Sequence, residues 1–146
     1  MKLKLLPLFL ITTLLFPLPL SAANKSYKQA SFPKYLPSLG DSVFPSSPNK
    51  PEGSTLIHQN FVIKGQNMDL FAKQYMKELR VREWKIKHYQ RKNLGGNQAS
   101  LVINGAHPLG YELRLSSSTV ATKNRDVKLK LILKKNLKIK RVNSAR

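Results

Sequence analysis

The sequence predicts an α+β domain in which one amphipathic helix packs on an antiparallel sheet of four to five strands. Within residues 54–134, a β-branched segment comes first, a stretch with helical periodicity follows, and several segments with two-residue alternation complete the domain. Short connections favour antiparallel neighbours. A domain of roughly 80 residues buries a marginal core, so we expect the helix to pack on the sheet rather than stand free.

The first strand is predicted over residues 55–64, which are rich in Thr, Ile, Val and Phe and end at Gly65. A helix is predicted over residues 67–81, because Asn67 is a suitable N-cap and Asp69 suits the first turn. Apolar residues at helical spacing form one face of this helix: Phe71, Ala72, Tyr75, Met76 and Leu79.

Further strands are predicted after the helix. In the first, Trp84, Ile86 and His88 alternate with Lys85, Lys87 and Tyr89. A hairpin connection over residues 93–97 and a connection over residues 104–109 frame the next strand, at residues 98–103. The last two strands are predicted over residues 110–116 and 127–134, with a polar loop at residues 117–126 between them. The result is a four-strand meander.

Residues 1–23 have the form of a signal peptide. Lys2 and Lys4 precede an apolar run, and the segment ends in the small residues Ser21, Ala22 and Ala23, which predicts cleavage after Ala23. Pro17 and Pro19 interrupt the apolar run before it reaches membrane-spanning length, so we expect no transmembrane helix after cleavage. The pattern predicts bacterial Sec-type export and a periplasmic or secreted protein.

Residues 24–53 and 135–146 flank the predicted domain. The first segment contains five prolines together with many Ser and Asn residues and has no helical or strand period, which predicts an extended arm that serves as a tether. Its scattered apolar residues leave a second interpretation open, a docking strip for a partner or for the domain's own surface. The last segment is predicted to be a flexible basic tail.

The stretch Ile63-Lys64-Gly65, with Tyr75, Leu79 and Trp84 after it and then an antiparallel meander, resembles small exported bacterial envelope domains. In those domains a strand ends in Gly, a helix carries a Tyr and a Leu, and a Gly-Trp step opens the sheet. The resemblance covers about residues 63–133 and implies an uncharacterised envelope protein without a known catalytic site. This sequence differs in having Glu83 before the Trp and in lacking a lipid-bearing Cys.

The residues that support catalysis are scarce. The chain contains no Cys, so disulfides, thiolate nucleophiles and Cys-ligated metals are excluded. His58, His88 and His107 fall on two predicted strands and one loop without metal-chelating spacing, and no Gly-x-Ser-x-Gly sequence occurs. We therefore predict a non-enzymatic protein with no cofactor and no metal.

The chain is strongly basic. It contains 26 Lys and Arg against 7 Asp and Glu, a formal net charge of +19, and residues 127–146 hold eight basic residues and no acidic one. If the apolar side chains of the last strand face the helix, its lysines face the other way and join those of the strand that begins at Trp84. The residues expected to bind anions on this face and in the tail are Lys85, Lys87, Arg91, Lys128, Lys130, Lys134, Lys135, Lys138, Lys140 and Arg141. The alternative is a solvated basic face without a partner.

This charge predicts an anionic partner. Export removes the protein from cytoplasmic nucleic acid, and Tyr89 is the one aromatic residue expected beside the cations, so nucleic acid is disfavoured. We therefore predict a small cationic domain that binds anionic envelope or host surfaces, such as anionic lipid, lipopolysaccharide or glycan. The alternative is an accessory subunit of an envelope or secretion assembly that docks through its Pro-rich arm and an edge strand.

Overall fold

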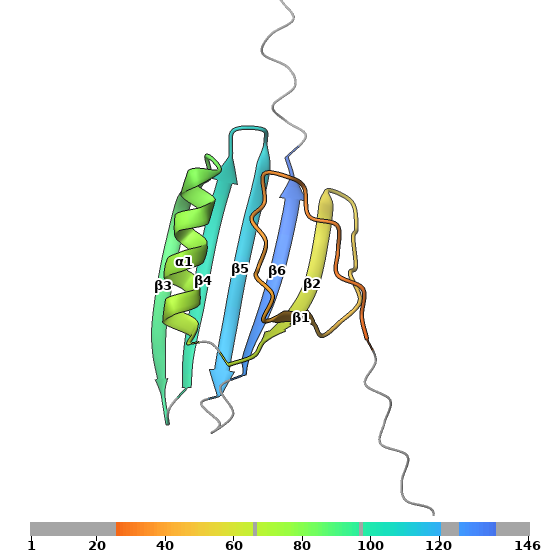
Figure 1. Cartoon of the computed structure of the whole chain (residues 1–146). Coiled ribbons are helices and arrows are strands. Elements are labelled where there is room, and N and C mark those ends of the chain that lie inside the picture. Colours follow the sequence, from red (N-terminus) through yellow and green to blue (C-terminus); the bar gives the residue numbers. More distant parts are fainter. Residues whose placement is uncertain (1–25, 66, 97, 121–125, 137–146) are drawn as a thin grey trace, which may run out of the picture.

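The computed structural model describes residues 26–65, 67–96, 98–120 and 126–136. In these residues one helix, α1 (Met68–Val81), covers part of one face of an antiparallel six-stranded sheet (Figure 1). The strands are β1 (Val43–Pro45), β2 (Thr55–Ile63), β3 (Lys85–Gly95), β4 (Gln98–His107), β5 (Tyr111–Val120) and β6 (Val127–Lys135). The predicted α+β class is confirmed, but the sheet has six strands rather than four to five.

The order of the strands across the sheet is β1-β2-β6-β5-β4-β3. The predicted meander forms the run β3 to β6, and β2 pairs with β6 rather than with β3, its neighbour in the sequence. Helix α1 therefore connects two strands that lie far apart in the sheet (Figure 1). The sixth strand is β1, which comes from the segment predicted to be an arm.

Both ends of α1 have local hydrogen bonds that fix its length. At the start, the side chain of Asn67 accepts a hydrogen bond from the backbone N–H of Asp69 at 2.8 Å, which confirms the predicted N-cap. At the end, the N–H of Trp84 donates to the carbonyl of Leu79 and the N–H of Glu83 donates to that of Arg80. This is a Schellman motif, and it places Glu83 at φ 65°, a conformation that glycine adopts more easily.

Strands β4 and β5 are longer than predicted. Residues 104–107 continue β4, so the turn into β5 is short and lies at residues 108–110. Residues 117–120 belong to β5 rather than to the predicted polar loop, because their backbone pairs with β4. Hydroxyl side chains are compatible with strands, and Ser117 is buried with its hydroxyl 2.8 Å from the sulfur of Met68.

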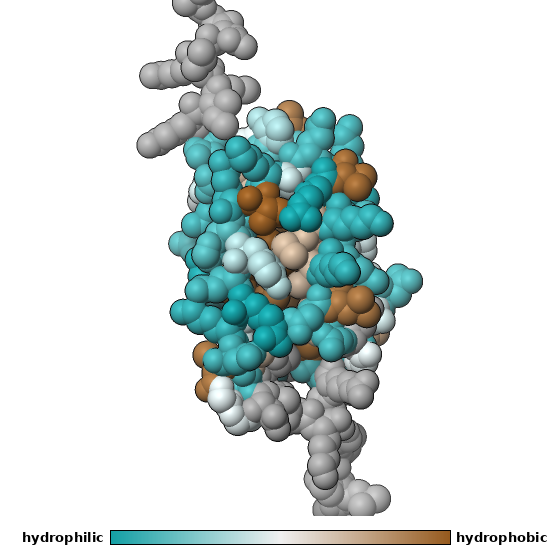
Figure 2. Space-filling model, turned by 90° about the vertical axis from the view of Figure 1, so that its left-hand side faces the viewer, coloured by the Kyte–Doolittle hydropathy of each residue, from teal (hydrophilic) through white to brown (hydrophobic). Residues whose placement is uncertain are grey.

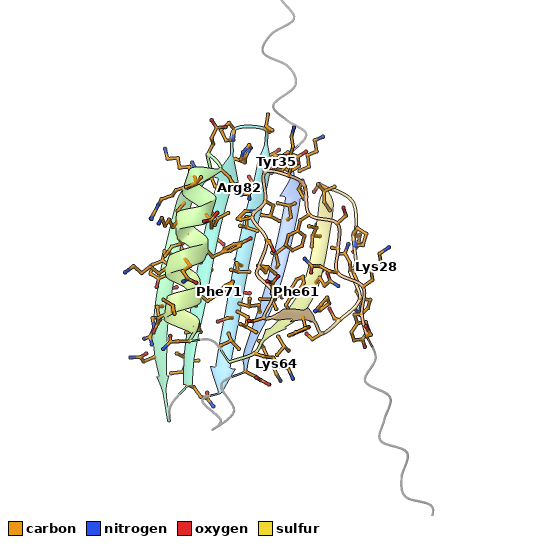
Figure 3. The ribbon with its side chains drawn as sticks, in the orientation of Figure 1. Lys28, Tyr35, Phe61, Lys64, Phe71 and Arg82 are labelled. Atoms are coloured by element: carbon orange, nitrogen blue, oxygen red, sulfur yellow. The ribbon has the colours of Figure 1, made fainter. Side chains whose placement is uncertain are left out.

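Residues 26–45 pack on the sheet beside α1. The segment runs from Lys28 near β2 to a turn at Tyr35, close to Arg82, and returns across the sheet to β1 (Figures 1 and 3). Leu36, Leu39 and Val43 are buried in the same core as α1 and the sheet. The interpretation of residues 24–53 as a tether is therefore wrong over this segment, and the folded domain starts well before residue 54.

Polar side chains of the domain hold the backbone of this segment. Gln59 is fully buried, accepts from the N–H of Ala30 at 2.8 Å, and donates to the carbonyls of Lys28 and Ser47. The segment has little regular structure of its own, so these side chains satisfy backbone groups that would otherwise be unpaired. The hydroxyl of Tyr75 also donates a hydrogen bond to the backbone carbonyl of Pro37, at 3.3 Å.

An aromatic cluster joins the end of α1 to the sheet. The ring of Tyr35 lies 5.0 Å from that of His107 and 4.5 Å from that of Tyr111, and the indole of Trp84 lies 5.2 Å from His107. Burial, with a hydrogen bond to Tyr111, raises the pKa of the Tyr35 phenol. Gly105 leaves room for the indole, since a Cβ there would lie 3.3 Å from Trp84 Cε3.

Candidate functional site

The candidate site is the face of the sheet opposite α1, which we call the open face. Alternate residues of each strand point to this side, and the residues between them point into the core. The open face consists of His58, Asn60 and Val62 of β2; Lys128, Lys130, Ile132 and Lys134 of β6; Glu112, Arg114 and Ser116 of β5; Ser100, Val102, Asn104 and Ala106 of β4; and Lys85, Lys87, His88, Gln90 and Lys92 of β3. Phe44 of β1 extends it at one edge, opposite Val62.

The open face is strongly basic. Among its described residues, seven side chains are Lys or Arg and Glu112 is the single carboxylate. Strands lie about 4.8 Å apart in a sheet, so cations on adjacent strands reinforce one another's potential. A surface of this kind attracts anions.

Two hollows lie on the open face, towards opposite ends of the strands. The first has a volume of about 350 Å³, and its lining includes Lys87, Asn104, Glu112, Arg114 and Lys134. The second has a volume of about 660 Å³, and its lining includes Asn60, Ser100, Ser116, Lys128 and Lys130. Each hollow therefore combines cations with neutral side chains that form hydrogen bonds.

Five of the residues predicted to bind anions come together on this face. Lys85 and Lys87 of β3 and Lys128, Lys130 and Lys134 of β6 all lie on it and are exposed. Their alternation with apolar residues predicted this placement. Strands β4 and β5 separate the two groups, so the cations are spread across the sheet rather than gathered at one point.

The placement of Arg91 was predicted wrongly. The pairing of β3 with β4 shifts between Ile86 and His88, so that Lys87 is an extra residue in β3. A bulge of this kind reverses the faces of the residues that follow it. Arg91 therefore points to the side of α1, where its Nε lies 2.5 Å from the Asp69 carboxylate, which raises the pKa of the Arg91 guanidinium.

Lys135 also lies away from the open face. It is the last residue of β6, on the core side, with its Nζ 5.7 Å from the centre of the Tyr111 ring. The N–H of Asn136 donates to the carbonyl of Gly110 at 2.6 Å, so the ordered chain continues past the predicted boundary at residue 134. Lys138, Lys140 and Arg141 lie outside the described residues, as does the predicted signal peptide.

Two cations of the open face were missed by the sequence interpretation. Arg114 alternates with Leu113 and Leu115, a pattern that was visible and that placed it on the same side as the lysines. Lys92 reaches the open face only because of the bulge, which no feature of the sequence indicated.

Aromatic side chains are sparse on the open face. The bulge turns Tyr89 to the other side of the sheet, where it pairs with Ile103, and Trp84 is buried in the core. In the part of the chain that the structure describes, Phe44 is the one Phe, Tyr or Trp on this face.

The three histidines do not meet. His58 and His88 lie on the open face on either side of β4, β5 and β6. His107 is buried, and its Nδ1 accepts from the N–H of Leu109 while its Nε2 lies 3.1 Å from the carbonyl of Arg82. Among the described residues, no group of three or more His, Asp or Glu side chains is placed to hold a metal ion.

Comparison of the chain with known protein families, with curated proteins and with solved structures finds no match. In the residues that the structure describes, α1 is too short and too polar to cross a membrane.

Proposed function

We propose that this protein is an exported, non-enzymatic domain that binds anionic envelope or host material through the open face. The observation that supports the proposal is the charge of that face: seven Lys or Arg side chains and one carboxylate, covered by no other described segment. Each Lys or Arg near an anionic layer contributes on the order of 1 kcal/mol, so several together support reversible binding.

The open face suits this role because the core does not depend on it. Lys128 and Lys130 are exposed, while Leu129 and Leu131 between them are buried against the other layer. The layer formed by α1 and residues 26–45 stabilises the fold from the opposite side (Figure 1). The basic side chains are therefore free to contact a ligand without rearrangement of the core.

Binding to a polyanion, measured at increasing salt, tests the proposal. The double variant Lys128→Gln/Lys130→Gln should bind more weakly and lose less affinity as salt rises, because fewer ions are released on binding. The matched control is Lys73→Gln/Lys77→Gln, which removes the same charge from exposed positions on α1. Equal effects of the two double variants, or no binding at low salt, would contradict the proposal.

The alternative, an accessory subunit of an envelope or secretion assembly, has weaker support. It relied on the apolar residues of the arm, and Leu36, Leu39 and Val43 are already buried in the protein's own core. The edge of β3 remains as a candidate docking element, since among the described strands β3 pairs with β4 alone. The side of the molecule that α1 and β3 form is largely hydrophilic, with small separate hydrophobic patches rather than one continuous apolar area (Figure 2).

A further inference from the structure

We propose that the ligand of the open face is an acidic polysaccharide and that the first hollow holds one of its acidic sugars. This inference rests on the proposed function, that the open face binds polyanions. It adds the chemical class of the ligand and a subsite lined by Lys87, Asn104, Glu112, Arg114 and Lys134.

The first argument is the mixture of side chains on the open face. Lys130 pairs across the sheet with Asn60 on one side and Ser116 on the other, and Arg114 pairs with Asn104. Amide and hydroxyl groups both donate and accept hydrogen bonds, as sugar hydroxyls do, whereas ionised phosphates only accept. A ligand that carries hydroxyls as well as charge therefore uses the cations and the neutral residues together.

The second argument is the amide of Asn104, which lines the first hollow. The side-chain oxygen of Asn104 is shielded from solvent and accepts no hydrogen bond from the described residues. An amide offers both an acceptor and N–H donors, so the side chain of Asn104 can bind a sugar hydroxyl in either direction, whereas a phosphate, sulfate or carboxylate oxygen can use only its N–H groups.

The third argument is the presence of Glu112 among the cations. A carboxylate repels a ligand that is only an anion, but it is a strong acceptor for the hydroxyls of a sugar. Asn136 donates one hydrogen bond to Glu112, at 3.4 Å, which leaves acceptor positions on the carboxylate. Lys87, Arg114 and Lys134 then remain for the acid group of the same sugar.

The composition of the open face disfavours the other polyanions. Single-stranded nucleic acid needs a series of aromatic platforms for successive bases, and the described open face holds only Phe44 at one edge. Its aliphatic residues, Val62, Val102 and Ile132, are half-buried and offer little to insert into a bilayer.

The test compares three polyanions at matched charge and ionic strength (polygalacturonate, polyphosphate and phosphatidylglycerol vesicles) with uncharged dextran as the fourth ligand. We expect polygalacturonate to bind about tenfold more tightly than polyphosphate or the vesicles, because it adds hydrogen bonds to the ion pairs. Dextran should not bind. If polyphosphate or the vesicles bind as tightly as polygalacturonate, this inference is overturned while the proposed function stands; if no polyanion binds at low salt, the proposed function fails as well.

A single substitution tests the subsite. Asn104→Ala should lower the affinity for polygalacturonate about fivefold and lower the affinity for polyphosphate by less. The matched control is Gln90→Ala, an exposed amide on the open face that lines neither hollow. Unchanged binding of polygalacturonate to a folded Asn104→Ala variant, or an equal loss for both ligands, would overturn the subsite. Should the variant fail to fold, the four-ligand comparison with the unmodified protein still decides the ligand class.

Discussion

The indole nitrogen of Trp84 donates a hydrogen bond to the backbone carbonyl of Tyr35 at 2.8 Å. The residue that follows the C-terminal turn of α1 therefore holds the turn of the N-terminal segment. Arg82 makes a parallel contact, since its Nη1 donates to the carbonyl of Lys34 at 2.5 Å. These bonds make residues 26–45 part of the folded domain rather than an appendage.

Substitution of Trp84 by Phe tests this connection. Trp84→Phe keeps an aromatic ring in the core but leaves the Tyr35 carbonyl without its partner, so we expect a loss of about 1 to 3 kcal/mol in the free energy of unfolding. Urea denaturation measures it. Limited proteolysis should also cut residues 26–45 faster in the variant; stability and cleavage equal to those of the unmodified protein would contradict the prediction.

The buried amide of Gln59 should contribute more to stability than the exposed amide of Asn60 beside it. Gln59→Leu removes three hydrogen bonds to the backbone of residues 28, 30 and 47, and we expect it to lower the free energy of unfolding by about 2 kcal/mol or more. Asn60→Leu, the adjacent exposed position on the open face, is the control and should change stability by less than about 0.5 kcal/mol. Equal effects of the two changes in thermal unfolding would refute the importance of this amide.

Glycine should be the better residue at position 83. Glu83 has a positive φ of 65°, and a side chain at such a position costs about 1 kcal/mol. We therefore expect Glu83→Gly to raise the free energy of unfolding by about that amount. Glu83→Ala removes the same charge but keeps the Cβ, so it should give no such gain; a gain from alanine as large as that from glycine would point to the charge instead.

The buried phenol of Tyr75 should make the folded protein less stable at high pH. Burial raises the pKa of its phenol above the ordinary value of 10.0, so above about pH 10 the unfolded chain loses this proton while the folded protein keeps it. The unfolded state then binds fewer protons, and stability falls by about 1.4 kcal/mol per pH unit for this group. Urea titrations above pH 10 should show a shallower fall in Tyr75→Phe than in the unmodified protein, and identical slopes would exclude this role.

Removal of residues 137–146, which belong to the predicted basic tail, should leave the fold intact. A chain that ends at Asn136 keeps β6 and the hydrogen bond from Asn136 to Gly110, and we expect its thermal midpoint to stay within about two degrees. It lacks Lys138, Lys140, Arg141 and Arg146. If these residues contact the polyanion, the salt dependence of binding should decrease; a large fall in the midpoint would show instead that the tail is packed.

Local periodicity predicted the helix and the strands whose alternation of apolar and polar residues lies within their own sequence. The N-cap at Asn67, the buried face of α1 and the alternation of β6 are all readable from short windows of sequence. The packing of residues 26–45 could not be predicted in this way, because Leu36, Leu39 and Val43 follow no period and each is buried by contacts with distant elements. Proline-rich composition indicated an extended backbone correctly but said nothing about what the backbone packs against.

Five of the ten predicted anion-binding residues were placed correctly, four of them by local periodicity. Strand alternation puts Lys85, Lys128, Lys130 and Lys134 on one side, and it would have added Arg114. The extra residue at Lys87 breaks the rule for the rest of β3. A bulge depends on how two strands pair, so it cannot be seen in one strand alone.

The pairing of β2 with β6 has a consequence for how the molecule is made. Ile63 lies opposite Val127, so the central partner of β2 is the last of the described strands to be synthesised. Until then the described partners of β2 are β1 and residues 46–52, all on one edge, and the hairpins from β3 to β5 form without it. Contacts so distant in sequence slow folding and leave an unpaired strand exposed in the meantime. The described sheet is therefore complete only after residues 127–135 have been synthesised.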